Sequence, residues 1–341
     1  MTLGIGIVGA GFMSRTYAFG IRELVQGASS VAVTGGTRAP GFADDFGIAL
    51  EPSLDALLAR DDVDIVLLGS PTQFHRDQTL AAARAGKHVF TEKPIAASLP
   101  EIDDMVAATR DAGVLLGVNA VSRWRKGIRM AKGLVDAGEI GDIRMVRHTY
   151  AFPATGYADP SHWINQPGAG SPFLDQGAHC NDAIRWFVGA DAVSAYAVYD
   201  TYTRTVPEGQ SAMVTYTFEN GVMCQIWASY EWAHAPESDK TIDYLFVGSK
   251  GMIDVGYRGE LQLHKGDGWE TLYVHPPVQQ PDPDIPFAYP YAEQTQDFVD
   301  AIREGREPEV TGEVARKGIE MALAADRSAA TGEVVHLPLV D

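Results

Sequence analysis

The chain has 341 residues, enough for about two to three domains of ordinary size, which excludes a peptide hormone or a short linear motif. Hydrophobic residues make up 45% and charged residues 21%, as in a folded enzyme and unlike a disordered or fibrous chain. Lys and Arg number 27 against 45 Asp and Glu, and the net charge of −18 argues against a nucleic-acid partner, because phosphate backbones require clustered positive charge.

The cysteine count and the hydropathy of the chain indicate its cellular compartment. The two cysteines, Cys180 and Cys224, are too few for a disulfide framework, and no Cys/His cluster has the spacing of a zinc site. No apolar run approaches the ~18 residues of a membrane span, and no basic leader precedes the first apolar run. We therefore expect a cytoplasmic protein without a bound metal and without a membrane partner.

The first 120 residues alternate short apolar runs with segments of helical character. The runs expected as strands are Ile5 to Val8, Val31 to Val33, Asp64 to Leu68, His88 to Phe90 and Val114 to Val118. Alternation of this kind is typical of βαβ units, and a continuous apolar run such as Ile65 to Leu68 indicates a strand buried on both faces. The prediction for residues 1–120 is a Rossmann domain with a doubly wound parallel sheet.

Residues 121–341 have a different texture. Helices are expected at Arg123 to Ala137, Asp175 to Phe187, Tyr291 to Glu304 and Gly312 to Ser328, with a Pro-rich loop at Pro276 to Pro290. Strands are expected at Ile143 to Phe152, Ala192 to Tyr202, Ser211 to Phe218, Val222 to Tyr230 and Thr241 to Val247. Asn220-Gly221 is a hairpin signal, so we predict an α+β domain with a mainly antiparallel open sheet. Whether the closing helices pack back on the first domain stays open.

The first strand runs into Gly9-Ala10-Gly11-Phe12-Met13-Ser14, a GxGxxG-like turn with Ser at its third position. Small residues let the backbone approach a pyrophosphate, and the helix that follows offers N–H groups and a positive dipole end. The string alone is a weak signal. Its place between the first apolar run and a helix favours a dinucleotide site that includes Gly9, Gly11, Phe12 and Met13.

The end of the second strand bears on the choice of cofactor. An NAD site usually has Asp or Glu there for the ribose hydroxyls, but residues 28–43 contain no acid and offer Thr37-Arg38 instead. Arg38 is suited to pair with a 2′-phosphate. NADP(H) is therefore the favoured cofactor, and NAD(H) with a solvated Arg38 stays the alternative.

Lys93 follows the fourth strand, at the sheet edge where ligands of open α/β sheets bind. With the glycine turn, the strings Gly86-Lys87-His88-Val89 and Glu92-Lys93-Pro94 resemble the glucose-fructose oxidoreductase / inositol dehydrogenase (Gfo/Idh/MocA) family. The resemblance implies that the loop with Ser70, Thr72 and His75 runs beneath the cofactor and that Glu92 and Lys93 lie at the cofactor site.

Gly168-Ala169-Gly170, Leu174-Asp175-Gln176-Gly177-Ala178-His179 and Asp182 resemble the signature of the family's second domain. One Gly is replaced by Ala169, and Pro172 is an extra residue. Independently of the resemblance, Asp175 and His179 are four residues apart and share a helix face, where a carboxylate can orient an imidazole for general-base work.

Other candidates for substrate contact are less specific. Asn119 and Arg123 follow the fifth strand, where substrate hydroxyls are bound, although Arg123 also fits a surface ion pair. Trp163 is suited to shelter a nicotinamide or a sugar ring, and it is equally suited to interface packing. The substrate set is thus Lys93, Asn119, Arg123, Trp163, Asp175 and His179.

The resemblance implies an NAD(P)-dependent oxidoreductase that acts on a secondary alcohol or ketone of a sugar or cyclic polyol, with its active site between the two domains. We expect His179, oriented by Asp175, to take the hydroxyl proton and Lys93 to hydrogen-bond the same oxygen; Lys93 as the base is the alternative. The rival functions are a redox-neutral glycoside-cleaving enzyme and a non-catalytic sugar sensor. Aromatic and apolar residues at both parities of 222–230 predict a homodimer or homotetramer through the second sheet.

Overall fold

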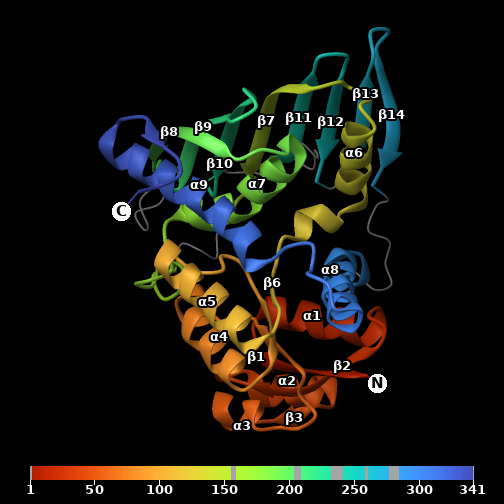
Figure 1. Cartoon of the computed structure of the whole chain (residues 1–341), viewed down its shortest axis with the longest axis vertical. Coiled ribbons are helices and arrows are strands. Elements are labelled where there is room, and N and C mark those ends of the chain that lie inside the picture. Colours follow the sequence, from red (N-terminus) through yellow and green to blue (C-terminus); the bar gives the residue numbers. More distant parts are fainter. Residues whose placement is uncertain are drawn as a thin grey trace. The chain divides into compact units, whose positions relative to one another are not determined.

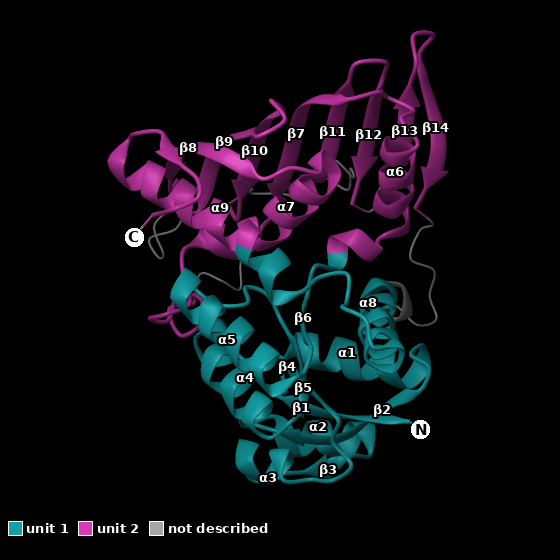
Figure 2. Cartoon of the chain, in the orientation of Figure 1, with its two compact units in different colours: residues 1–121, 278–316 teal, residues 122–277, 317–341 magenta. Residues whose placement is uncertain are grey.

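The structure is a computed structural model that describes residues 2–154, 159–202, 209–231, 241–257, 260–275 and 284–340, without the side chains of 284–286. It contains two compact units, residues 1–121 with 278–316 and residues 122–277 with 317–341 (Figure 2). The first unit thus includes a C-terminal segment that a division at residue 120 assigns to the second domain.

Unit 1 is built on a six-stranded sheet with the order β3-β2-β1-β4-β5-β6 (Figure 1). Its strands are β1 (Leu3–Val8), β2 (Ala28–Thr34), β3 (Ala49–Leu50), β4 (Ile65–Leu68), β5 (His88–Thr91) and β6 (Leu116–Val118). All neighbouring strands pair in parallel, and every residue of β4 is buried. This confirms the predicted Rossmann domain, in which strand order reverses beside β1 and creates a ligand crevice.

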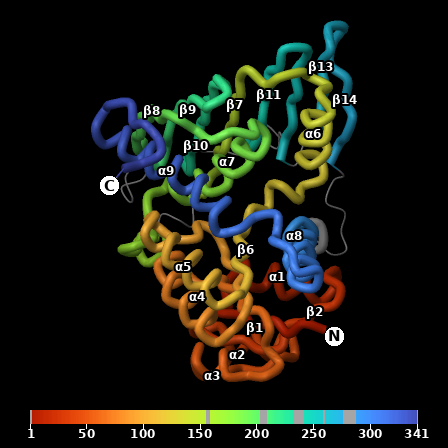
Figure 3. The backbone as a smooth tube through the Cα atoms, in the orientation of Figure 1, coloured from red at the N-terminus to blue at the C-terminus, as the bar shows by residue number. Residues whose placement is uncertain are grey.

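The unit 1 helices are α1 (Phe12–Glu23), α2 (Ala39–Phe46), α3 (Leu54–Leu58), α4 (His75–Arg84), α5 (Leu99–Ala112) and α8 (Asp284–Glu304), with the 3-10 turn η1 (Thr72–Phe74) before α4. Although they are far apart in the sequence, α1 and α8 lie side by side (Figure 3). Aromatic rings join them, with Tyr17 and Tyr291 edge to face at 5.5 Å between centroids.

The predicted Pro-rich loop is wrong over its second half, because α8 begins at Asp284 and includes Pro290. A proline inside a helix removes one hydrogen bond, and here the aromatic contacts with α1 compensate for it. The first half of that loop, residues 276–283, lies outside the described residues.

Unit 2 carries a nine-stranded sheet with the order β14-β13-β12-β11-β7-β10-β9-β8-β15. Its strands are β7 (Ile143–Ala151), β8 (Ala192–Asp200), β9 (Ser211–Phe218), β10 (Met223–Ser229), β11 (Ile242–Gly248), β12 (Met252–Gly256), β13 (Glu260–His264), β14 (Trp269–Val274) and β15 (Val335–His336). Neighbours are antiparallel except β10 and β7. The mainly antiparallel sheet is confirmed, although strands β12 to β15 were not predicted.

Three helices cover one face of this sheet, α6 (Lys126–Asp136), α7 (Pro172–Val188) and α9 (Gly312–Thr331), the last of which begins in unit 1 (Figure 1). The ring of Phe187 on α7 stacks on Phe246 of β11 at 4.2 Å between centroids. The predicted helix start at Arg123 is wrong, since a 3-10 turn, η2 (Val121–Trp124), precedes α6. Helix α7 begins earlier than predicted, because Ser171 caps it and Pro172 suits its first position.

Candidate active site

The glycine turn between β1 and α1 forms an open cradle. Gly9 has φ +91°, and a Cβ there would lie 2.9 Å from the carbonyl oxygen of Gly69. A Cβ on Gly11 would meet a single atom within 4 Å, the Arg38 guanidinium nitrogen Nη2 at 3.8 Å. No side chain caps the start of α1, so its first N–H groups face this space, as a dinucleotide pyrophosphate requires. These residues fit the predicted cofactor.

The structure explains why Ser14, and not glycine, stands at the third position of the turn. Ser14 is buried, and its Oγ lies 2.2 Å from the place that a Cβ on Gly69 would take. Helix α1 therefore approaches the end of β4 so closely that one of the two facing residues must be glycine. Here the glycine stands at position 69, which leaves room for the small Ser14 side chain.

The loop after β2 has no acidic side chain. Gly35 and Gly36 both have positive φ, and Thr37 and Arg38 behind them are exposed. Arg38 starts α2 and reaches toward Gly11. An exposed guanidinium at this place can recognise a phosphate bidentately.

The loop after β4 is held from inside the unit. Ser70 Oγ donates a hydrogen bond to Gln78 Oε1 over 2.5 Å. Thr72 and His75 are 2% and 1% exposed, so neither side chain presents a surface to a ligand. If this loop contacts the cofactor as predicted, it does so through its main chain. On α1, by contrast, Phe12 is exposed and Met13 is half-buried.

Lys93 lies after β5 and is half-buried. Its own backbone N–H donates to Glu92 Oε2 over 3.0 Å, and Asn119 Nδ2 donates to Glu92 Oε1 over 2.8 Å. Burial raises the pKa of Glu92, while the Asn119 hydrogen bond and the Lys93 charge act in the opposite direction. Glu92 is 6% exposed and Asn119 3%, so both shape the loop under Lys93 from within.

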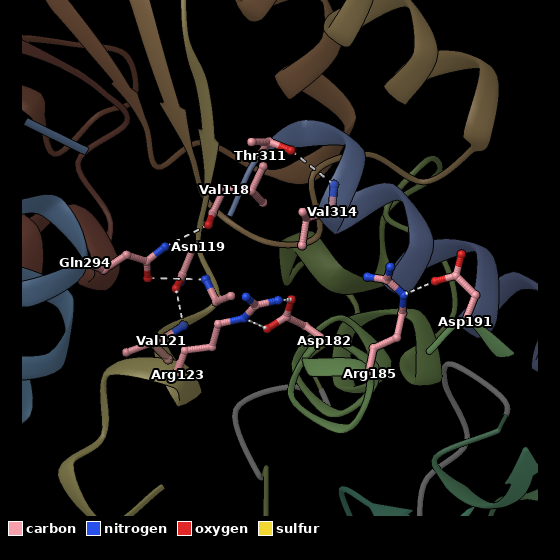
Figure 4. Close-up of polar contacts among 11 residues, drawn as sticks. Val118, Asn119, Val121, Arg123, Asp182, Arg185, Asp191, Gln294, Thr311 and Val314 are labelled. Carbon is pink, nitrogen blue, oxygen red and sulfur yellow. Dashed lines mark hydrogen bonds and ion pairs between the residues drawn. The ribbon is translucent and has the colours of Figure 1, made fainter. Parts of the chain in front are cut away.

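Gln294 of α8 hydrogen-bonds the main chain on both sides of Asn119, just after β6 (Figure 4). Its Nε2 donates to the Val118 carbonyl over 2.7 Å and its Oε1 accepts from the Ala120 N–H over 3.2 Å, while Asn119 Oδ1 accepts from the Val121 N–H over 2.9 Å. Sequence reasoning missed Gln294, because no local signal links it to a strand end 174 residues away.

In unit 2, Asp175 and His179 stand one turn apart on α7, as predicted. Asp175 is 2% exposed, and Tyr230, just after β10, donates its hydroxyl to Asp175 Oδ2. His179 is half-buried, and its ring stacks with that of Tyr150 on β7 at 5.9 Å between centroids and 28° between planes. The two tyrosines were missed as partners of the pair.

The neighbourhood of this pair is aromatic. Trp163 is half-buried and packs with Tyr230 and Ile164 in a small apolar cluster. His162 lies beside Asp175, and burial lowers the pKa of His162 while the Asp175 charge raises it. Ala169, the substituted glycine, is 1% exposed and avoids positive φ, which explains why alanine is tolerated there.

Arg123 is placed in a buried ion pair with Asp182 of α7 (Figure 4). The guanidinium donates through Nε and Nη2 to the two carboxylate oxygens over 2.8 and 2.6 Å, and the side chains are each 5% exposed. The guanidinium also lies over the ring of Trp186, 5.4 Å from its centroid. Substrate binding by Arg123 stays a prediction that must be reconciled with this pair.

The described residues contain no group of three or more His, Cys, Asp or Glu arranged to hold a metal ion. Within the same ranges, Cys180 and Cys224 are both unbridged and buried. None of the described helices combines the length and the apolar character that a membrane crossing demands.

Comparison with known proteins finds relatives that match nearly the whole chain. The chain is 27% identical over 339 residues to 1,5-anhydro-D-fructose reductase of Ensifer adhaerens, which covers 97% of this chain and 98% of the relative. It is 26% identical over 343 residues to scyllo-inositol 2-dehydrogenase (NAD(+)) of Bacillus subtilis (strain 168), covering 97% and 95%. The solved scyllo-inositol dehydrogenase from Lactobacillus casei with NAD(H) and scyllo-inositol matches with a TM-score of 0.83 and 26% identity over 98% and 99% of the two chains.

The family comparisons divide the chain as the two sheets do. Residues 3–120 match the oxidoreductase family with an NAD-binding Rossmann fold, and residues 128–254 match the GFO/IDH/MocA C-terminal domain. The two matches together span most of the chain. The chain belongs to the Gfo/Idh/MocA oxidoreductase family.

Proposed function

We propose that the protein is an NAD(P)-dependent oxidoreductase that transfers a hydride between nicotinamide and a secondary alcohol or ketone carbon of a sugar or cyclic polyol. The observation that carries the proposal is the uncapped glycine cradle at Gly9 and Gly11, in the same unit as Lys93. The substrates named for the relatives, an anhydro-sugar and an inositol, support the substrate class.

The chain's own groups supply the proton chemistry. The nicotinamide, when bound, is the hydride acceptor or donor. His179 takes the proton of the substrate hydroxyl, Asp175 orients the imidazole, and Lys93 donates a hydrogen bond that stabilises the developing alkoxide. The half-buried state of Lys93 and His179 supports direct contact with a ligand, whereas the buried Asp175 acts through its neighbour.

The test is a panel of inositols, aldoses and anhydro-sugars, with absorbance of the reduced nicotinamide and release of free sugar recorded together. Absorbance change without cleavage supports the dehydrogenase. Sugar release at constant absorbance would instead establish the redox-neutral glycoside-cleaving enzyme. Binding without either signal would leave a sugar sensor.

For the cofactor, we propose a preference for NADP(H) over NAD(H). Arg38 is exposed beside the cradle, and the loop after β2 has no carboxylate to repel a 2′-phosphate. Arg38→Ala should weaken NADP(H) binding by about 1.5–3 kcal/mol, the usual contribution of a charge-assisted hydrogen bond, and leave NAD(H) binding unchanged. Arg22→Ala, which removes an exposed arginine paired with Glu23 in the last turn of α1, away from the cradle at its first turn, is the matched control. Equal wild-type affinity for both cofactors contradicts the preference.

We also propose that the protein forms a homodimer or homotetramer through the open face of the unit 2 sheet. Val198, Met213 and Trp227 lie opposite one another on β8, β9 and β10, and they are 56%, 56% and 44% exposed. Met223 and Met145 form a second exposed pair on the same face. Such an apolar surface supports a symmetric partner. Light scattering at micromolar concentration tests this, and a monomer would refute it.

A further inference from the structure

His75 is the first residue of α4, and its ring lies between two loops that follow neighbouring strands. Nδ1 is 3.0 Å from the carbonyl oxygen of Pro94 and 3.3 Å from that of Ile95, while Nε2 is 2.8 Å from the carbonyl oxygen of Ser70. The ring is 1% exposed. It therefore bridges the loop after β4 and the loop that carries Lys93, and it reaches both through the main chain.

The two sides of the ring are not equivalent. Carbonyl oxygens only accept hydrogen bonds, so a neutral imidazole can donate to one side and the imidazolium to both. Burial lowers the pKa of His75, although the three carbonyls act in the opposite direction, and this favours the neutral ring at neutral pH. Two oxygens face Nδ1, those of Pro94 and Ile95, whereas Nε2 faces only that of Ser70, in the shortest of the three contacts. A hydrogen on Nδ1 serves both carbonyls of the Lys93 loop, and the proposal takes this tautomer.

We propose that His75 is a positioning residue for Lys93, because its Nδ1–H fixes the main chain immediately after Lys93 at Pro94 and Ile95. The inference rests on the proposed function, in which Lys93 contacts the reacting oxygen. A lysine on a four-carbon stem gains orientation only if its backbone is fixed, and a displacement of about 1 Å in a reacting geometry can lower the rate ~100-fold. His75 itself has no surface for substrate or cofactor, so its effect passes through Lys93.

Two substitutions separate the two sides of the ring. In His75→Asn the amide nitrogen takes the place of Nδ1 and can still donate to Pro94, whereas in His75→Gln the amide extends toward the place of Nε2 and Ser70. We expect His75→Gln to lower kcat by at least about tenfold more than His75→Asn, with KM for the polyol changed less than about threefold in both.

Hydrogen exchange of residues 93–98 in the cofactor-free protein gives a second readout. Faster exchange in His75→Gln than in His75→Asn, at equal protection of the unit 2 sheet, supports the assignment. Equal loss of kcat in the two variants, a larger loss in His75→Asn, wild-type behaviour of both, or failure of both to fold would overturn it. If the wild type turns over no polyol, the proposed function fails, while the exchange comparison still decides whether His75 fixes the Lys93 loop.

Discussion

Lys93 in unit 1 and Asp175 in unit 2 are held by different kinds of contact. The loop of Lys93 is fixed by buried polar groups, since Glu92 accepts from both the Lys93 N–H and the Asn119 amide. Asp175 lies on a long helix and accepts a hydrogen bond from Tyr230, whose ring packs in the small apolar cluster with Trp163 and Ile164.

The difference has a physical reason. A loop at a strand end leaves backbone groups unpaired, and buried amides and carboxylates satisfy them, whereas a helix satisfies its own backbone and needs only its side chains to be oriented. A substitution at Lys93 should therefore change mainly the rate of the reaction. In unit 2, loss of one member of a buried charge pair should mainly lower the free energy of unfolding.

The largest effect is expected at the Arg123/Asp182 pair. Asp182→Ala leaves the Arg123 guanidinium buried without its carboxylate and should lower the free energy of unfolding by about 3–5 kcal/mol, measured by urea denaturation. Asp191→Ala is the control, since Asp191 pairs with Arg185 of the same helix and with Lys317 at a partly exposed site, and it should cost about 1 kcal/mol or less for each pair. Equal losses in the two variants would show that the buried pair contributes no more than a surface pair.

At Lys93 the expected change is in rate. Lys93→Met should preserve the fold and dinucleotide binding but lower kcat about 100-fold or more, because one charged donor is lost at the reacting oxygen. Lys87→Met, which removes a lysine bonded to the Arg60 carbonyl at the other end of β5, should leave kcat unchanged. Turnover of Lys93→Met close to wild type would exclude the assigned role.

Local patterns were sufficient to predict the Rossmann sheet, the glycine turn, the place of Lys93 just after a strand, and the shared helix face of Asp175 and His179. Each depends on neighbours within a few residues, either a strand followed by a turn or a four-residue helical spacing. Lys93 and His179 are half-buried, and their contact with a ligand stays part of the proposed function.

The supporting contacts could not be predicted in this way. Tyr230 reaches Asp175 across 55 residues and Gln294 reaches Ala120 across 174, and neither has a sequence signal of its own. Helix α8 was shortened in the prediction because Pro290 suggested a loop, whereas packing of Phe287 and Tyr291 against α1 decides the outcome. Tertiary packing overrides local propensity in this helix.

A smaller effect, on stability, is expected at the N-terminus of α7. Asp326 accepts from Ser171, the cap of α7, and from Tyr199, and burial raises the pKa of Asp326 to about 6 from 3.8. Between pH 4 and 6 the folded state holds the proton more tightly than the unfolded chain, so rising pH lowers stability by about 2 kcal/mol.

Asp326→Asn cannot titrate, and the pH dependence of its free energy of unfolding should lose this component. Thermal or urea denaturation from pH 4 to 7 measures the difference between wild type and variant. Asp267→Asn, at an exposed turn, should follow the wild-type curve. A constant difference between wild type and Asp326→Asn over this range would contradict the assignment.

The smallest expected effect, that of Tyr230, is on the pH dependence of the rate, which His179 and Asp175 are expected to set. In the oxidation direction the imidazole of His179 must be neutral to accept a proton, so the rate should rise with pH to a plateau, and His179→Ala should remove the inflection. Asp175→Asn should move the inflection to lower pH and lower the plateau, because the imidazolium loses a stabilising charge and the ring loses its orienting partner.

Tyr230→Phe removes the hydroxyl that donates a hydrogen bond to Asp175 Oδ2, which strengthens the negative charge near His179. The inflection should then move to higher pH, with a plateau lowered less than about tenfold. An inflection that survives in His179→Ala would identify another base, with Lys93 the first group to test.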